Sequence, residues 1–193
     1  METIRAFIAI ELPAELRQEL ARLQASLKSD SQPRIKWANP DGIHLTLKFL
    51  GNIPVSNIDR ITQAMTDAAI QITPFYLETE ALGAFPNLKR VQVIWVGLDG
   101  ETDKLNQLQQ LIETNLVQLG FAAEQRQFKP HLTLARLGMD VSSGERQRLG
   151  ELIAATSFKK GKRVKVDSIN LIKSQLTREG AVYSRIFSAG LLK

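Results

Sequence analysis

The chain contains only two histidines, and each begins the same tetrapeptide, His-Leu-Thr-Leu. The match extends to eight residues, HLTLKFLG at 44–51 and HLTLARLG at 131–138, with six identical positions. Corresponding residues are 87 apart, since 131 − 44 = 87. Imidazole exchanges protons near neutral pH, because its ordinary pKa is about 6.5. Two histidines in duplicate contexts therefore predict a matched acid–base pair.

Strand geometry indicates how each motif presents its side chains. Alternate residues of a β-strand project from the same face, so His44 and Thr46 share one face while Leu45 and Leu47 point into a core. The second motif, from His131 to Leu134, repeats this arrangement. Two such strands facing each other across a pseudo-two-fold axis place one imidazole on each side of a cleft, with hydroxyls on its floor.

That arrangement suits in-line displacement at phosphorus. A neutral imidazole takes a proton from the incoming water, while an imidazolium gives one to the departing oxygen. Two hydroxyls can donate hydrogen bonds to the non-bridging phosphate oxygens as charge builds there. A lone histidine in a strand is more often a surface or core residue, but recurrence of the same polar pair favours a catalytic role for Thr46, Thr133 and both histidines.

The elements around the motifs also occur twice at constant spacing. Apolar strand patterns at 4–12 and 91–99 precede amphipathic helical patterns at 14–29 and 101–120, and Gly120 is a natural helix stop. Further helical patterns follow the two motifs, at 54–70 and 141–156. Additional strands are expected at 74–85, 163–176 and 181–192.

We therefore expect an α+β fold with two lobes, each a duplicated strand–helix–strand–helix unit. Antiparallel sheets related by a pseudo-two-fold axis should surround a central cleft. Residues 1–193 form one domain in this interpretation, with the internal repeat at approximately 4–70 and 91–156 and a C-terminal hairpin at 163–192.

Composition narrows the functional class. The 193 residues include no cysteine and no run approaching the ~18 apolar residues of a membrane span. The start, METIRAFIAIELP, lacks the basic region and cleavage site of a signal peptide, so a cytoplasmic protein is expected. Twenty-five Lys and Arg against 20 Asp and Glu give a net charge of +5, which favours phosphate or nucleic-acid substrates.

A two-histidine metal site would need additional acidic ligands. Only Asp41 lies close to His44 in sequence, and no acidic residue lies within six positions of His131. Metal catalysis is therefore not expected, and we predict no cofactor.

At this point the residues resemble a known family. Two copies of His-x-Thr-x, with x usually apolar, define the two-histidine (2H) phosphoesterases. The chain is most similar to the RNA 2',3'-cyclic phosphodiesterases of bacteria and archaea, historically called 2'-5' RNA ligases. The resemblance covers nearly the whole chain and includes RAFIAIELP at 5–13, Trp37, GAFP at 83–86, WVGL at 95–98, PHLTLAR at 130–136, and a C-terminal hairpin containing Leu176 and Tyr183.

The resemblance implies the bilobal α+β fold and metal-independent hydrolysis of RNA-terminal 2',3'-cyclic phosphate to a 2'-phosphate. His44 then corresponds to the general acid, the proton donor to the leaving 3'-oxygen. His131 corresponds to the general base, the proton acceptor from water, and Thr46 and Thr133 bind phosphate. The residues alone leave the acid and base open, because the two motifs are nearly symmetric.

Several further residues are candidates for substrate contact. Arg136 occupies the place of a phosphate-binding arginine in the family, although regular strand parity points it away from His131 unless a bulge intervenes. Lys48 shares parity with His44 and can face the cleft or solvent. Phe7 corresponds to a family phenylalanine near the base or ribose, with a core role as the alternative. Trp37 and Tyr183 could stack on a base or fill an interface, and the basic run at 159–165 could contact RNA backbone.

The alternatives within this chemistry are other phosphodiester substrates or the reverse reaction. The substrates are ADP-ribose 1'',2''-cyclic phosphate and 2'-5'-linked oligonucleotides, and the reaction is reversible 2'-5' ligation of RNA. A protein of another class, a non-catalytic module that binds RNA ends, would also use the basic excess and the hydroxyls. The expected partner is RNA with a 2',3'-cyclic phosphate end or a small cyclic nucleotide. We expect a monomer with no obligate protein partner and no membrane association.

Overall fold

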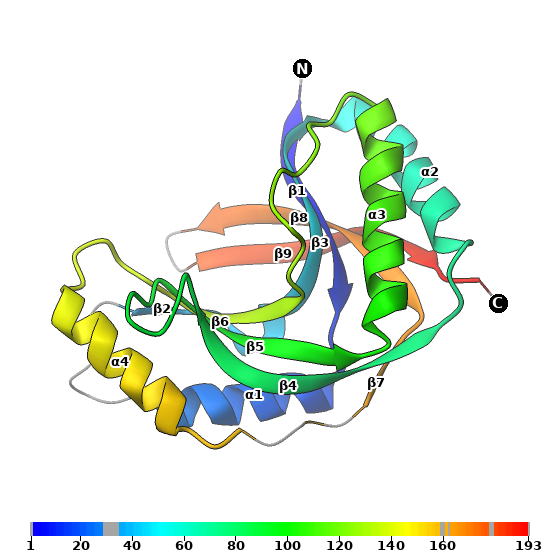
Figure 1. Cartoon of the computed structure of the whole chain (residues 1–193). Coiled ribbons are helices and arrows are strands. Elements are labelled where there is room, and N and C mark those ends of the chain that lie inside the picture. Colours follow the sequence, from blue (N-terminus) through cyan, green and yellow to red (C-terminus); the bar gives the residue numbers. More distant parts are fainter. Residues whose placement is uncertain (1, 29–34, 159–160, 162, 178–179, 193) are drawn as a thin grey trace.

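Strands from both halves of the sequence join into one curled sheet with helices against it (Figure 1). The computed structural model describes residues 2–28, 35–158, 161, 163–177 and 180–192. Within these residues the sheet has nine strands in the order β7-β4-β5-β6-β3-β1-β8-β9, and β2 pairs with β6. The strands are β1 (Thr3–Glu11), β2 (Ile35–Trp37), β3 (His44–Pro54), β4 (Phe75–Phe85), β5 (Val93–Gly100), β6 (His131–Leu137), β7 (Val164–Val166), β8 (Ser168–Thr177) and β9 (Gly180–Gly190).

The two motif strands meet at the middle of the sheet. β3 and β6 run antiparallel, and their paired residues are Leu45 and Leu132. These residues are 87 apart, so each occupies the same place in its motif. An antiparallel contact between equivalent residues places a pseudo-two-fold axis at this pair. The two expected sheets are therefore joined edge to edge as one, through the motif strands themselves.

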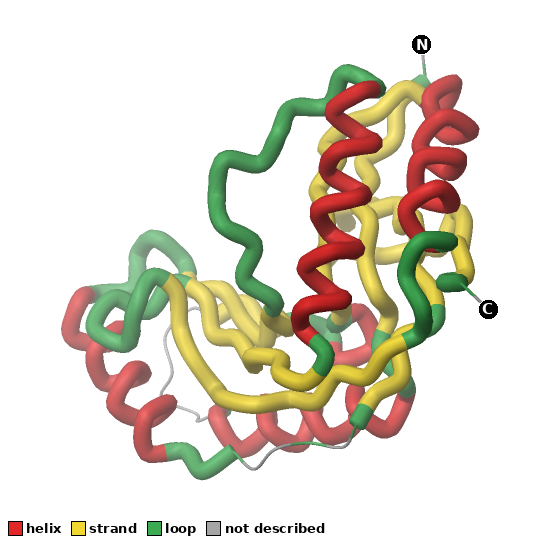
Figure 2. Tube along the Cα trace, turned by 45° about the vertical axis from the view of Figure 1, so that its right-hand side comes forward, coloured by secondary structure: helices red, strands yellow, loops and turns green. Residues whose placement is uncertain are grey.

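The first helix of each sequence repeat lies against the half of the sheet that the other repeat forms. The helices are α1 (Ala14–Leu27), α2 (Ile58–Ala69), α3 (Thr102–Gln118) and α4 (Ser143–Ala155), with 3-10 turns η1 (Pro40–Gly42) and η2 (Val55–Asn57). α1 follows β1 but lies with α4 beside β4, β5 and β6 (Figure 1). α3 follows β5 but packs against α2 and β3. In the turned view of Figure 2 the two helix pairs lie well apart.

The helix patterns match the observed buried faces. Leu16, Leu20, Leu23 and Leu27 of α1 are buried, as are Leu105, Leu108, Ile112 and Leu116 of α3. Burying one leucine side chain stabilises a fold by about 1.5–3 kcal/mol, so each face holds its helix against the sheet. α3 ends before Gly120, whose φ of 93° is a left-handed conformation that favours glycine. No helix in the described part of the chain is long and apolar enough to cross a membrane.

The predicted strand at 163–176 is two strands in different places. β7 pairs with β4 at one end of the sheet, whereas β8 pairs with β1 and β9. Only Asp167 separates them in the chain, so the polypeptide passes there from the β4 edge of the sheet to the strands on the other side of the motif pair. The final hairpin formed by β8 and β9 agrees with the prediction. β2 was not predicted.

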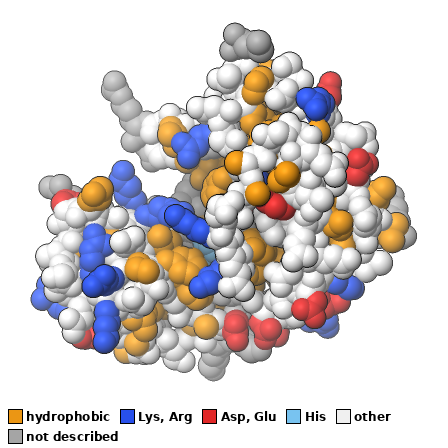
Figure 3. All heavy atoms as spheres, turned by 45° about the horizontal axis from the view of Figure 1, so that its top comes forward, with side chains coloured by type: hydrophobic (Ala, Val, Ile, Leu, Met, Phe, Trp, Pro, Cys, Tyr) orange, Lys and Arg blue, Asp and Glu red, His pale blue; other side chains and the backbone are white. Residues whose placement is uncertain are grey.

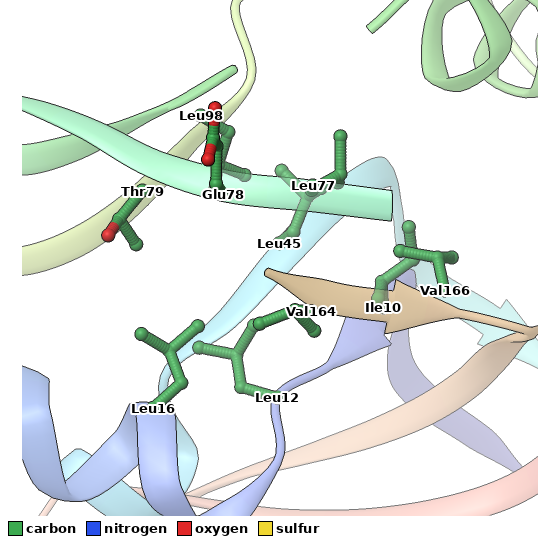
Figure 4. A pocket seen from close by; sticks show the side chains of 10 residues that line it. All are labelled: Ile10, Leu12, Leu16, Leu45, Leu77, Glu78, Thr79, Leu98, Val164 and Val166. Carbon is green, nitrogen blue, oxygen red and sulfur yellow. The ribbon is translucent and has the colours of Figure 1, made fainter. Parts of the chain in front are cut away.

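A small void lies on the helix side of the sheet, beneath the first motif (Figure 4). Its volume is about 10 Å³, close to the room that a single water needs. The side chains around it come from both halves: Ile10, Leu12, Leu16, Leu45, Leu77, Glu78, Thr79, Leu98, Val164 and Val166. This mostly apolar void belongs to the core, on the opposite side of β3 from His44.

Candidate active site

The motif side chains alternate between the core and the face of the sheet that the helices leave open, hereafter the open face. Leu45 and Leu132 are fully buried, while the histidines and threonines beside them are half-buried. The antiparallel register about the two leucines sets His44 across from Thr133, and Thr46 across from His131. Each imidazole therefore has a hydroxyl from the other motif as its cross-strand neighbour.

Both imidazoles are held in the same way. His44 Nδ1 lies 2.7 Å from the Gly42 carbonyl, and His131 Nδ1 lies 2.7 Å from the Lys129 carbonyl. A carbonyl oxygen can only accept, so Nδ1 carries the hydrogen in each neutral ring and donates it. This leaves Nε2 of both rings as the nitrogen that exchanges protons. The clamp uses the carbonyl two residues before each histidine.

The wall around His44 is aromatic. Phe7 stacks on the imidazole with ring centroids 4.5 Å apart, and Tyr183 approaches it edge-on at 5.2 Å. Tyr183 also covers Gly42, where an added Cβ would lie 3.1 Å from the tyrosine ring. Phe7 is only 3% exposed and also packs with Ala9 and Ile172, so little of its ring is open to a substrate. A direct contact between Phe7 and substrate stays a prediction.

Different aromatic residues surround His131. Phe85 meets the imidazole edge-on at 4.9 Å, and Trp95 lies 6.4 Å from it. The indole lies flat over Gly83, where a Cβ would come within 2.5 Å of the ring carbons. Sequence reasoning did not single out Phe85 or Trp95 as site residues. The available signal was their place in the GAFP and WVGL segments, which support the family resemblance.

Burial and charge act differently on the two imidazoles. Burial lowers the pKa of His44, against opposing contributions from the Gly42 carbonyl and the carboxylate of Glu11. Burial also lowers the pKa of His131; the Lys129 carbonyl opposes this, while the Arg136 guanidinium lowers the pKa further. Glu11, which pairs with His44 across β1 and β3, also forms an ion pair of 2.9 Å with Arg185. Burial is thus the main influence on both pKa values, and the charges of Glu11 and Arg136 act on the two rings in opposite directions.

Each motif strand contains a β-bulge directly after its threonine. In β3 the extra residue is Leu47, because Ala9 pairs with Thr46 and Ile8 with Lys48. In β6 the extra residue is Leu134, which lies between the partners of Trp95 and Ile94. A bulge reverses the alternation that follows it, so the two residues after each threonine are both buried. The third residue then returns to the open face.

The bulge in β6 brings Arg136 onto the side of His131. Arg136 is exposed, and its charge acts on that imidazole. The regular-strand objection to Arg136 is thereby removed. The corresponding residue of β3 is Phe49, which is 64% exposed. One motif thus carries a cation at this place and the other carries a phenyl ring.

The same geometry corrects the prediction for Lys48. Its side chain is 8% exposed, and Nζ donates to Glu113 Oε1 at 2.6 Å and to the Ala122 carbonyl at 2.8 Å. Lys48 therefore lies on the helix side, and both predicted placements, facing the cleft or facing solvent, are wrong. The prediction assumed a regular strand, whereas the bulge at Leu47 shifts Lys48 to the other face. Lys48 instead ties α3 to the loop that leads to His131.

The remaining candidates fall into separate places. Trp37 pairs across from Ala135, packs against the core, and has the Lys28 ammonium 5.3 Å from its ring. It fills an interface, whereas Tyr183 borders the site. In the basic run, Lys159, Lys160 and Lys162 lie outside the described residues. Arg163 covers the ring of Tyr76 at 4.5 Å.

The space-filling view shows a hollow with a histidine side chain in its depth (Figure 3). Lysine and arginine side chains gather along one border of this hollow, and hydrophobic side chains lie beside them. Throughout the described part of the chain, no three His, Cys, Asp or Glu side chains come together in a way that could hold a metal ion. The site thus offers two imidazoles, two hydroxyls and a guanidinium to an anionic substrate.

Comparison with known proteins identifies the family of this chain. A model of the LigT like Phosphoesterase family matches the chain twice, over residues 10–95 and 96–183. The chain belongs to this family. Each matched stretch contains one of the two motifs.

Relatives and solved structures agree with this family over almost the whole chain. An RNA 2',3'-cyclic phosphodiesterase of Methanothermobacter thermautotrophicus is 31% identical over 181 residues, covering 94% of this chain and 95% of that protein. One of Aeropyrum pernix is 33% identical over 170 residues, covering 87% and 92%. The crystal structure of TT0787 of Thermus thermophilus superposes with a TM-score of 0.78 at 25% identity, covering 97% and 98%. E. coli LigT complexed with 3'-AMP gives 0.78 at 24% identity and covers both chains fully (100%).

Proposed function

We propose that this LigT-like phosphoesterase hydrolyses the 2',3'-cyclic phosphate at RNA ends, and of small cyclic nucleotides, to a 2'-phosphate. The observation that carries the proposal is the pair of imidazoles, each held through Nδ1 by the carbonyl two residues earlier and each with a threonine of the other motif as cross-strand neighbour. The names of the relatives from M. thermautotrophicus and A. pernix support the same substrate class.

In the proposed reaction, the oxygen of a water attacks phosphorus as the bond to the 3'-oxygen breaks. His131 Nε2 accepts the proton that the water loses, and His44 Nε2–H donates a proton to the leaving 3'-oxygen. One water is consumed, and the products are a 2'-phosphomonoester and a free 3'-hydroxyl. The protons return to their starting nitrogens through solvent exchange after product leaves.

The charges beside the two rings support this assignment of roles. The carboxylate of Glu11 raises the pKa of His44, whereas the guanidinium of Arg136 lowers that of His131. These two charges act in the directions that a proton donor at His44 and a proton acceptor at His131 require, in addition to the burial that lowers the pKa of both rings. The two motifs alone do not provide this distinction, because their sequences are nearly identical.

Thr46, Thr133 and Arg136 would bind the phosphate. The hydroxyls donate to the non-bridging oxygens, where negative charge increases in the transition state. The guanidinium adds a planar set of donors on the His131 side. No step in this scheme uses a metal ion, so activity should survive prolonged dialysis against a chelator.

The test is a comparison of kcat/KM over a panel of phosphodiesters with untagged protein. The panel holds RNA ending in 2',3'-cyclic phosphate, 2',3'-cyclic nucleotides, ADP-ribose 1'',2''-cyclic phosphate and 2'-5'-linked oligonucleotides. The proposal expects the RNA-terminal cyclic phosphate among the best substrates. A clear preference for another diester, or ligation of RNA ends faster than hydrolysis, would replace the assignment. Tight binding of the cyclic end without turnover would identify a binding module.

We also propose that a single chain in the cytoplasm carries out this reaction. Both motifs come from the same polypeptide, so the site is completed without a second copy. Gel filtration with activity measured across the eluted peak checks this: activity should follow the monomer of 21.6 kDa. Activity confined to a larger species would contradict it.

A further inference from the structure

A buried glutamine on α1 reaches across the molecule to the second motif. Gln24 is 1% exposed, and its Nε2 donates to the carbonyls of Ala38 and Leu134, each at 2.9 Å. The amide has two hydrogens, so one can serve each carbonyl. The bond to Leu134 joins residues 110 positions apart in sequence.

The two carbonyls mark the junction of β2 with the bulge of β6. Leu134 is the extra residue of that bulge, and its carbonyl also accepts from the backbone N–H of Ala38 at 2.8 Å. Beyond this junction Trp37 pairs with Ala135, and Lys36 pairs with Arg136. Gln24 therefore ties the end of β2 to the residue that reverses the alternation of β6.

The polarity of Gln24 indicates a role beyond filling the core. Its Oε1 is buried and has no hydrogen-bond partner within the described residues. A buried oxygen without a partner is destabilising, and an apolar side chain of similar size would avoid that penalty. The neighbouring buried positions of α1 on this face, Leu20, Leu23 and Leu27, are all leucines. The hydrogen bonds that Gln24 donates to Ala38 and Leu134 offset this penalty.

We propose that Gln24 is a positioning residue that acts through Arg136. By fixing the bulge at Leu134 and the register of β2 against β6, it keeps the Arg136 guanidinium on the open face beside His131. This inference rests on the proposed function for the role of Arg136 in binding phosphate. The placement of Arg136 beside His131 is a structural claim that can be tested without turnover.

The direct test uses proton NMR of the imidazole Hε1 signals across pH, in untagged protein. The chain has two histidines, so the spectrum contains two titrating signals that His44→Ala and His131→Ala assign. Arg136→Ala removes a nearby cation and should raise the pKa of His131. Gln24→Met, which keeps the volume and loses both donors, should raise it in the same direction and leave the pKa of His44 unchanged.

A double variant separates positioning from general loosening. In Gln24→Met/Arg136→Ala, the pKa of His131 should match that of Arg136→Ala alone, because the cation through which Gln24 acts is already gone. Ile61→Val serves as the control, since it removes a buried methyl from α2, which packs against α3, β8 and β9, and it should leave both titrations as in wild type. A folded Gln24→Met protein with the wild-type titration of His131 would overturn the proposal. A further rise in the double variant would do the same.

Kinetics supply the second readout. Arg136→Ala should raise KM for a 2',3'-cyclic nucleotide about tenfold, the scale of a hydrogen bond to a charged group. Gln24→Met should raise KM by a smaller factor in the same sense, with kcat less affected, and the double variant should equal Arg136→Ala within about twofold. If wild type turned over none of the panel, the proposed function would fail while the NMR result still decided the placement of Arg136.

Discussion

The two motif strands are the same in the parts that handle protons and different in the parts around them. Both have an imidazole clamped by the carbonyl two residues earlier, a threonine, and a bulge directly after it. After the bulge, one strand presents Phe49 on the open face and the other presents Arg136. Glu11 lies beside His44, and among the described residues no matching carboxylate acts on His131. The duplicated part thus holds the two imidazoles and hydroxyls in equivalent places, and the diverged part gives them neighbours of different charge and shape.

The bulges are also held by unlike interactions from the exchanged helices. At the first, Lys48 pairs with Glu113 of α3, whose carboxylate also accepts from the backbone N–H of Glu124 at 2.7 Å. At the second, the neutral amide of Gln24 on α1 donates to two carbonyls. Each helix therefore supports the motif strand of the other repeat. A change in one repeat is expected to affect the catalytic residue contributed by its partner.

The largest expected effects come from the shared features. Replacing either His44 or His131 by alanine should lower kcat by roughly 10²–10⁴-fold on RNA-terminal cyclic phosphate, the usual contribution of one general acid or base. Both variants should retain the wild-type melting temperature to within a few degrees, because each ring is only half-buried. Steady-state rates with circular dichroism melts check this. Near-normal activity in either variant would contradict the claim that both histidines transfer protons in the reaction.

The threonines should be the next most sensitive and should respond alike. Thr46→Val and Thr133→Val keep the shape and remove one hydroxyl donor each, so kcat should fall roughly 10²-fold in both. Thr62→Val on α2, whose hydroxyl donates to the Asp59 carbonyl, is the matched control and should keep full activity. A large loss in only one motif would show that a single lobe binds the phosphate.

Replacing Lys48 distinguishes a role in supporting the first bulge from a role in binding substrate. Lys48→Met leaves Glu113 largely buried without its cation, so the free energy of unfolding should fall by about 2–3 kcal/mol. Lys104→Met removes a more exposed ion pair with Glu101 at 3.0 Å and should lower the free energy of unfolding less than Lys48→Met does. Urea denaturation measures both. At temperatures where Lys48→Met stays folded, KM should stay within about threefold of wild type, and a tenfold rise would return Lys48 to the substrate.

The smallest effects concern pH. With His131 neutral and His44 protonated in the active form, kcat/KM should be bell-shaped: the acid limb reports His131 and the alkaline limb reports His44. Glu11→Gln removes the carboxylate that raises the pKa of His44 and leaves Arg185 unpaired, so the alkaline limb should move to lower pH. Arg136→Gln should move the acid limb to higher pH. If Glu11→Gln instead moved the acid limb and Arg136→Gln moved the alkaline limb, the roles of the two histidines would be exchanged.

The sequence was sufficient for the central residues because they follow simple rules. Period-two alternation places His44 and Thr46 on one face, and the constant spacing of the repeats predicts their counterparts. The apolar faces of α1 and α3 follow from helical periodicity in the same way. These features depend on local pattern, so they can be predicted from one chain.

The features that were missed depend on contacts between distant segments. The bulges at Leu47 and Leu134 arise from the pairing of each motif strand with its neighbour, and they moved Lys48 and Arg136 to opposite faces from those that parity predicts. The exchange of α1 and α3 between the halves, and the break at Asp167, likewise leave no local signal. Phe85 and Trp95 reach His131 only through the pairing of β4, β5 and β6.

The most direct test of the paired-imidazole account follows the fate of the phosphate in H₂¹⁸O. Wild-type protein is incubated with a short RNA ending in 2',3'-cyclic phosphate, and mass spectrometry with ³¹P NMR identifies the product. Paired acid–base catalysis by the two imidazoles predicts that wild type forms only a 2'-phosphate carrying one ¹⁸O. The rate of this reaction should fall by orders of magnitude in His44→Ala and in His131→Ala. A 3'-phosphate product, or unchanged turnover in both variants, would contradict it.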